Sequence, residues 1–117
     1  MELPDHLDPS LIRRIIDLGQ HPDLESPTVL DSFEDLRSCD WINRLHWSIW
    51  NNAVKSLTAQ EMVALVKALS TMEDRWCWAG GSVAAAIWVL QDLGKRDSTS
   101  AEFVRQWLRA HSKNPYL

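Results

Sequence analysis

The chain has 117 residues, 45% of them hydrophobic, with seven tryptophans and a net charge of −4. This length and composition exclude a disordered tail and predict one folded domain over residues 1–117. No apolar run could span a bilayer, and the first ten residues lack the basic and apolar regions of a signal peptide. We therefore expect a cytoplasmic protein without a membrane partner, with residues 1–8 and 112–117 loosely ordered.

The charge is unevenly distributed along the chain. Residues 1–40 carry three basic and ten acidic side chains, a net charge of −7, whereas residues 41–75 sum to +1 and residues 76–117 to +2. An acidic front repels phosphate backbones, so nucleic acid is not the expected partner. It would suit a basic protein, although a solvated acidic face that aids solubility is the commoner explanation.

In the first half of the chain, prolines, glycines and capping residues mark helix-sized segments, and nothing alternates with period two. Asp8 before Pro9 predicts the start of a first helix, and Gly19 fits its C′ position. A short helix is expected over residues 31–38. A longer one is predicted over residues 41–56, where apolar residues cover more than half of the circumference and indicate a central helix.

The second half contains clearer local signals. Thr58 and Glu61 form a capping box that predicts a helix over residues 59–76. Ser82 is expected to cap a helix over residues 83–93 that Gly94 ends, and a second capping box at residues 99–102 opens a last helix to about residue 111, which buries Phe103, Val104 and Trp107. The predicted fold is all-α, a single compact bundle of five or six short helices.

Two tryptophans are candidates for a binding edge. Trp47 and Trp78 fall near polar or loop positions, whereas Trp50, Trp76 and Trp88 point toward the core by helical direction. An exposed tryptophan is a common anchor of protein–protein binding. The alternative is that both rings only close the ends of the core.

Few side chains suggest catalysis. His46 falls in the apolar arc of the helix predicted over residues 41–56, where a buried imidazole is more often structural than catalytic. Glu73 lies in the apolar stripe of its helix and would need a cation or donors, so pairing with an arginine is expected ahead of acid–base chemistry. Cys77 is expected to be a buried thiol, and its pairing with Cys39 is left open. With no metal-binding or nucleophile signature, we expect neither a metal nor a cofactor, and not an enzyme.

The segment Gly80–Gly81–Ser82 allows two interpretations. In the first, one glycine takes a positive φ to end a helix, and Ser82 begins the next one. In the second, the free N–H groups of that helix start bind an anion or a small ligand. The spacings of the known phosphate loops are absent, which favours the first interpretation.

Three short motifs carry a resemblance. Trp78-Ala-Gly-Gly-Ser-Val83, Ile87-Trp88 and Asn114-Pro115-Tyr116 resemble the pattern of a family of small uncharacterised bacterial all-α proteins. The resemblance extends from Leu57 to the C-terminus. It implies a bacterial source and a helical fold, but the family has no established activity to carry over.

Together these observations predict a protein–protein interaction module of the adaptor, regulator or immunity type. Its partner would be another protein, expected to be basic, bound through the acidic surface and the edge at Trp47 and Trp78. Self-association through the same edge is one alternative. The other is small-ligand or anion binding at residues 80–82 with Glu73 and His46, an enzyme being the minority case.

Overall fold

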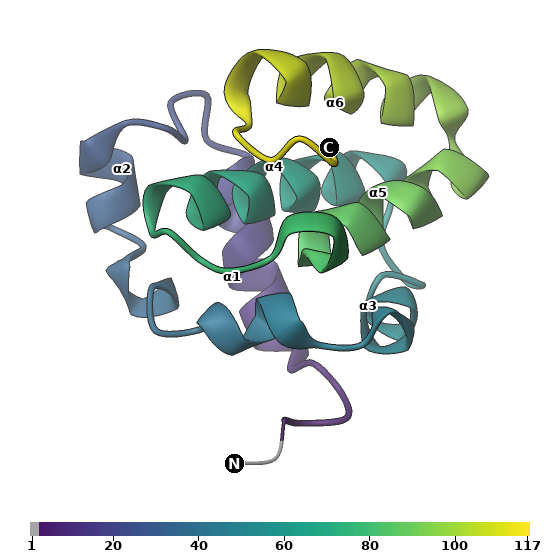
Figure 1. Cartoon of the computed structure of the whole chain (residues 1–117), viewed down its shortest axis with the longest axis horizontal. Coiled ribbons are helices and arrows are strands. Elements are labelled where there is room, and N and C mark those ends of the chain that lie inside the picture. Colours follow the sequence, from purple (N-terminus) through teal and green to yellow (C-terminus); the bar gives the residue numbers. More distant parts are fainter. Residues whose placement is uncertain (1–2) are drawn as a thin grey trace.

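The longest helix, α4 (Ala59–Arg75), is the element against which three other helices pack in the computed structural model of the protein, which describes residues 3–117 (Figure 1). Its capping box is confirmed, because the Glu61 N–H donates to Thr58 Oγ1 and the Thr58 N–H donates to the Glu61 carboxylate. The helices in contact with α4 are α1 (Pro9–Gly19), α5 (Ala85–Arg96) and α6 (Ser98–His111).

The core lies between these helices and the shorter ones. Met62, Leu65, Val66 and Met72 of α4 are fully buried, and every other helix adds at least one buried side chain. Residues 3–117 contain no strand, so the predicted all-α bundle is confirmed. No helix in this range is long and apolar enough to cross a membrane. The smaller elements are α2 (Pro27–Asp31), α3 (Trp47–Ala53) and the 3-10 turns η1 (Glu34–Leu36), η2 (Asp40–Arg44) and η3 (Gly81–Val83).

Helix α1 begins as predicted but ends for a different reason. The Ser10 N–H donates to the Asp8 carboxylate at 2.8 Å, and Pro9 takes the first helical position. Gly19 is the last residue of the helix and not a C′ residue of positive φ. A side chain here would overlap the backbone carbonyl of Ala64, so glycine is required by the close approach of α1 to α4.

The single helix predicted over residues 41–56 is wrong. The chain forms η2, becomes extended at Leu45 and His46, and then begins α3 at Trp47. His46 caps α3, because its Nδ1 accepts from the Ser48 N–H at 3.2 Å. Across the break, the indole Nε1–H of Trp50 donates to the carbonyl of Ile42 at 3.1 Å, which replaces a helical hydrogen bond by a tertiary one.

Two further expected boundaries are corrected. The helix expected over residues 31–38 is instead divided between α2 and η1. Ser82 lies inside η3, and α5 begins only after Ala84, with the Ala85 N–H donating to Asn43 Oδ1 at 2.9 Å. Gly94 does not end α5, which continues to residue 96.

The start of α6 also differs from the expected capping box. The cap is Asp97, whose carboxylate accepts from the Ser100 N–H at 3.1 Å. This hydrogen bond lowers the pKa of Asp97 below its ordinary value. Aspartate at the N-cap therefore fixes the tight turn between α5 and α6.

Exchanging the two helical glycines for alanine should have opposite effects. Gly19→Ala should lower the free energy of unfolding by about 3 kcal/mol, because the new methyl group overlaps the Ala64 carbonyl. Gly94→Ala should raise it by about 0.5–1 kcal/mol, because its methyl group meets nothing closer than Arg105 Nη2 at 3.6 Å and alanine favours the helix. Urea denaturation of both variants measures these changes, and similar effects at both positions would contradict the assigned packing.

Candidate functional site

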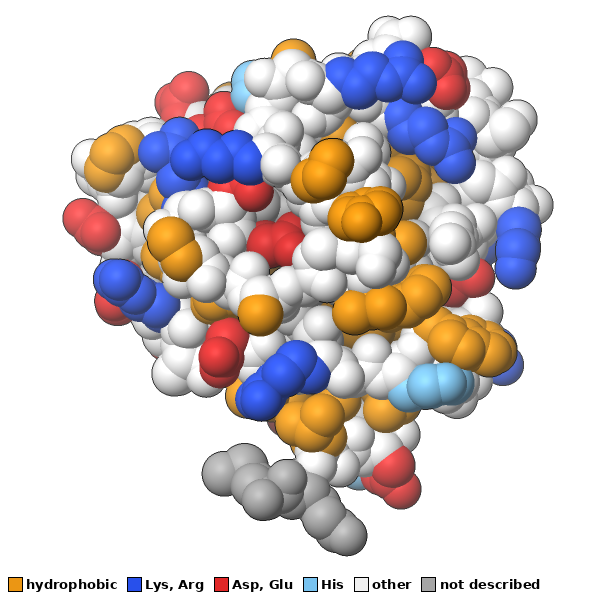
Figure 2. All heavy atoms as spheres, in the orientation of Figure 1, with side chains coloured by type: hydrophobic (Ala, Val, Ile, Leu, Met, Phe, Trp, Pro, Cys, Tyr) orange, Lys and Arg blue, Asp and Glu red, His pale blue; other side chains and the backbone are white. Residues whose placement is uncertain are grey.

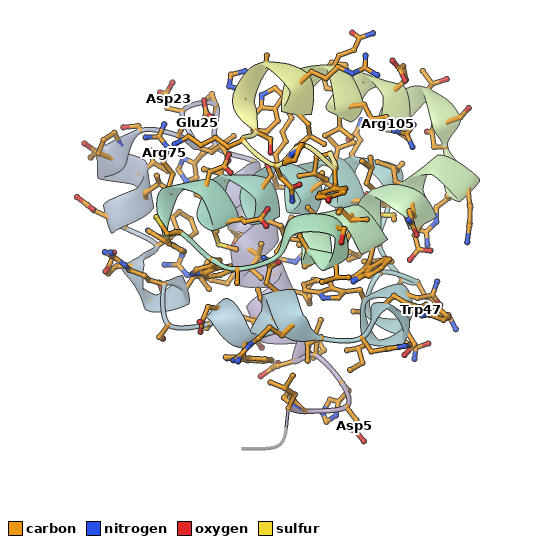
Figure 3. The ribbon with its side chains drawn as sticks, in the orientation of Figure 1. Asp5, Asp23, Glu25, Trp47, Arg75 and Arg105 are labelled. Carbon is orange, nitrogen blue, oxygen red and sulfur yellow. The ribbon has the colours of Figure 1, made fainter. Side chains whose placement is uncertain are left out.

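Trp47 is the most exposed tryptophan of residues 3–117, with 51% of its surface accessible. It is the first residue of α3, and the ring of His46 lies against it with centroids 5.1 Å apart. His46 is itself exposed, so its predicted burial in an apolar arc is wrong. The pair forms a projecting aromatic corner of the molecule (Figure 3).

The segment from η2 through the end of α3 packs along α5 in the same chain order. Asn43 bonds to Ala85, and one step further along both segments the Asn51 amide donates to Asp92 at 3.0 Å. Further on, the Arg96 guanidinium donates to backbone carbonyls of residues 54 and 57. Trp47 therefore begins a helix that packs on α5.

The C-terminal segment lies beside η3. The Asn114 amide donates to the carbonyl of Gly81 at 2.9 Å, and its Oδ1 accepts from the Tyr116 N–H. Tyr116 is 64% exposed and Val83 55% exposed. The segment expected to be loosely ordered at residues 112–117 is thus tied to the body of the protein.

These side chains define one surface, here called the aromatic strip. Figure 2 shows hydrophobic side chains gathered on this face over the C-terminal tail, the start of α5 and the start of α3. The indole Nε1 of Trp88 is the one buried side-chain polar atom among residues 3–117 that has no hydrogen-bond partner. The aromatic strip consists of Trp47, Val83, Trp88 and Tyr116.

Trp78, the other predicted anchor, is not part of the strip. Only 8% of its surface is exposed, and its ring lies 5.7 Å from that of Trp76. The chain turns sharply at Cys77, whose φ of 56° is unusual for a residue with a side chain. That turn lets the Trp78 N–H donate to the Glu73 carbonyl at 3.0 Å and directs the ring inward, while Cys77 is exposed and not buried as expected.

Glu73 is buried without a cation. Its side chain accepts from the Gly81 N–H at 3.3 Å and from the Asn114 amide at 3.3–3.4 Å, and no arginine or lysine lies within ion-pair distance of it in the described chain. The predicted arginine partner is therefore wrong. Burial raises the pKa of Glu73 above its usual value, and the Asn114 and Gly81 hydrogen bonds oppose that rise only in part.

The two glycines of the loop serve different purposes. Gly80 packs so tightly that a side chain there would overlap the Glu73 carboxylate and the Asn43 amide. Gly81 has a φ of 62° and open space around it, so the expected positive-φ glycine is confirmed. Ser82 caps nothing.

Three N–H donors at this loop are already engaged. The N–H of Gly81 donates to Glu73, that of Val83 to the Gly80 carbonyl, and that of Ala85 to Asn43. The neighbouring carboxylate also disfavours a second negative charge. Gly81 and Glu73 are thus joined by a hydrogen bond, Gly80 packs against them, and Ser82 lies exposed beside them.

Two acidic residues of the first third lie away from Trp47. Asp23 and Glu25 lie at the opposite side of the molecule from Trp47 (Figure 3). Part of the charge is internally paired, since Arg14 donates to Asp35 at 3.0 Å and lowers its pKa. Cys39 and Cys77 are free thiols, and residues 3–117 hold no cluster of three metal-binding side chains.

Glu73 should give the stability of the protein a distinctive pH dependence. Its pKa is raised in the folded state, so the folded protein holds the proton more tightly, and stability is lost as the pH rises from the ordinary glutamate pKa of 4.5 through the raised pKa. The difference in free energy of unfolding between wild type and Glu73→Gln should therefore fall between pH 4 and 7, because glutamine does not titrate. Urea denaturation across this range measures the difference.

Asn114→Ala provides the matched control. It removes one donor to the Glu73 carboxylate, so the pKa of Glu73 should rise further and the interval of falling stability should move to higher pH. A difference between wild type and Glu73→Gln that stays flat with pH would contradict the buried position of this carboxylate.

Comparison with known proteins identifies no relative of this chain. No protein family model matches the chain, and no curated protein or solved structure is significantly similar to it. The resemblance drawn from Trp78–Val83 and Asn114–Tyr116 stays a prediction. A function for this protein has to come from the chemistry of its own surface.

Proposed function

We propose that this protein is a protein–protein interaction module, of the adaptor, regulator or immunity type, that binds its partner on the aromatic strip. The observation that supports this most directly is Trp47, a large ring that is half exposed on a fixed helix terminus. Tryptophan and tyrosine dominate the binding energy of known interfaces. Trp47 and Tyr116 would be the anchors, with Val83 and Trp88 between them.

Rigid presentation of the strip favours this role. Asn51 and Arg96 bind α3 to α5, and Asn114 binds the C-terminal tail to η3. Side chains held in place before binding lose little conformational entropy on docking. The strip therefore resembles a prepared docking surface more than a flexible loop that orders on contact.

The unsatisfied indole of Trp88 gives a second reason. A buried donor without an acceptor costs free energy, and native proteins keep few of them. A small shift of this ring on binding would let a carbonyl group of the partner accept the hydrogen bond. An interface here would thus supply the hydrogen bond that the Trp88 indole lacks in the isolated chain.

Charge would act at longer range. Asp23 and Glu25 lie on the opposite side of the molecule from Trp47, so their contribution would be to steer a basic partner and not to contact it. A bacterial cytoplasm is the setting that we propose for this encounter. Anion binding at residues 80–82, the alternative, has less support because the N–H donors of Gly81 and Val83 are engaged.

Trp47→Ala should abolish capture of the partner without unfolding the protein. Loss of a half-exposed anchor should weaken binding by at least about 2 kcal/mol, or roughly thirtyfold. Trp47→Ala should keep the thermal stability of the wild type because Trp47 contributes little to the core. Wild type and Trp47→Ala are used as baits in a quantitative pull-down from a lysate of the native host. The captured protein is then titrated with each bait to measure the change in affinity.

Two comparison variants make this test specific. Phe103→Ala removes a ring of similar exposure from α6, outside the strip, and should leave the affinity for the protein captured through Trp47 unchanged. Trp78→Ala should instead destabilise the fold by about 3–5 kcal/mol, since that ring is buried. Equal capture by wild type and Trp47→Ala would refute the proposal, and a wild type that sediments as a dimer dissociated by Trp47→Ala would assign the strip to self-association.

A further inference from the structure

A groove lies on the surface between α4 and α6. Its cavity has a volume of about 350 Å³ and opens to solvent. The residues around it come from the first halves of both helices. They are Gln60, Val63, Thr99, Ser100 and Phe103.

The two helices run in the same direction, as their contacts show. Thr99 and Gln60 meet at one end, Lys67 lies over Phe103 and Trp107 in the middle, and the Lys113 N–H donates to Asp74 beyond the other end. Successive turns of α4 and α6 therefore face the same groove. The hollow itself is lined by the first halves of both helices, and Lys67 and Trp107 follow about one turn further along them.

Phe103 is exposed in this groove. The sequence predicts that α6 buries Phe103 and Trp107 along with Val104, but Phe103 is 60% accessible and Trp107 is only partly buried. The reason is geometric, since Val104, Leu108 and Ala101 occupy the side of α6 that meets α4 and α5. Two aromatic faces are consequently left for solvent or for a partner.

Lys67 supplies the charge of the groove. Its ammonium lies 5.4 Å from the ring centroids of both Phe103 and Trp107. No carboxylate of residues 3–117 lies within 4.0 Å of it. A partly buried cation between two rings keeps an attraction for an anion that the chain itself does not satisfy.

We propose that this groove is a second docking site, and that it binds an acidic, amphipathic segment of another protein. An apolar side chain of that segment would lie on Val63 and Phe103, and an aspartate or glutamate would reach Lys67. A carboxylate held by a lysine that already stacks on aromatic rings is well suited to a site of this shape. With the aromatic strip on α3 and α5, the protein would hold two partners at once.

The proposal does not depend on the aromatic strip. The groove is built from α4 and α6, whereas Trp47 and Trp88 belong to α3 and α5. A Trp47→Ala protein should therefore bind the acidic segment as the wild type does. Failure of one site leaves the other open to its own test.

Selection from a displayed library of random peptides tests the groove with the full-length protein. Peptides are enriched on the Trp47→Ala protein, which lacks the anchor of the aromatic strip, and the enriched peptides should combine aspartate or glutamate with leucine or an aromatic residue. The strongest peptide is then synthesised and titrated. Its affinity should fall about tenfold or more for Lys67→Glu and for Phe103→Ala.

Two variants separate charge from packing and from net charge. Lys67→Met keeps the apolar stem and should lose the preference for acidic over glutamine-substituted peptide. Lys55→Glu makes the same charge change at an exposed position after α3 and should bind within about twofold of the wild type. Circular dichroism of each variant confirms that the helices are retained.

The results that overturn the proposal are distinct. They include enriched peptides without an excess of acidic residues, equal binding to Lys67→Glu, and no enrichment at all. A wild type that dimerises and becomes monomeric in Phe103→Ala would assign the groove to a second copy of the chain. A single-stranded oligonucleotide that binds the wild type but not Lys67→Glu would assign it to nucleic acid.

Discussion

The buried carboxylate of Glu73 constrains the whole region that follows α4. A carboxylate removed from water has to be supplied with donors, and none of them here is a cation. The loop at Gly81 and the tail at Asn114 must therefore approach the end of α4. Gly80 permits the approach because it has no side chain, and Asn43 accepts from the first N–H of α5. The buried Glu73 side chain thus holds the loop at Gly81 and the tail at Asn114 against the end of α4.

That constraint also shapes the surface. The hydrogen bonds around Glu73 hold η3 and the C-terminal turn together, and they bring Val83 and Tyr116 beside the start of α5. The packing of α3 on α5 adds Trp47 to this surface. The Glu73 carboxylate lies below the surface and the aromatic side chains lie on it. The groove with Lys67 has a different origin, because α6 has more aromatic side chains than its contact with α4 can bury. The two surfaces are therefore independent consequences of the same small bundle.

Interactions within one helical turn were predictable from the sequence. Asp8 with Pro9 and Thr58 with Glu61 act through neighbours two or three residues away, and both caps are present. The break at His46 was not predicted, since the apolar pattern of residues 41–56 suits a helix throughout. It is the indole of Trp50 bonding to Ile42, and the capping by His46, that make the break favourable. Trp78 was misplaced for a related reason: a single positive φ at Cys77 reverses the direction of its ring.

The sequence by itself determined the helical class, the starts of α1 and α4 and the presence of a buried carboxylate at Glu73, because periodicity, capping and burial in an apolar stripe are local properties. It also identified Trp47 as a candidate anchor. Only the tertiary structure decided which donors satisfy Glu73, that Trp78 is internal, and that Lys67 lies between Phe103 and Trp107. These contacts join residues from different helices, and their distances follow from how whole helices pack and not from any pattern along one of them.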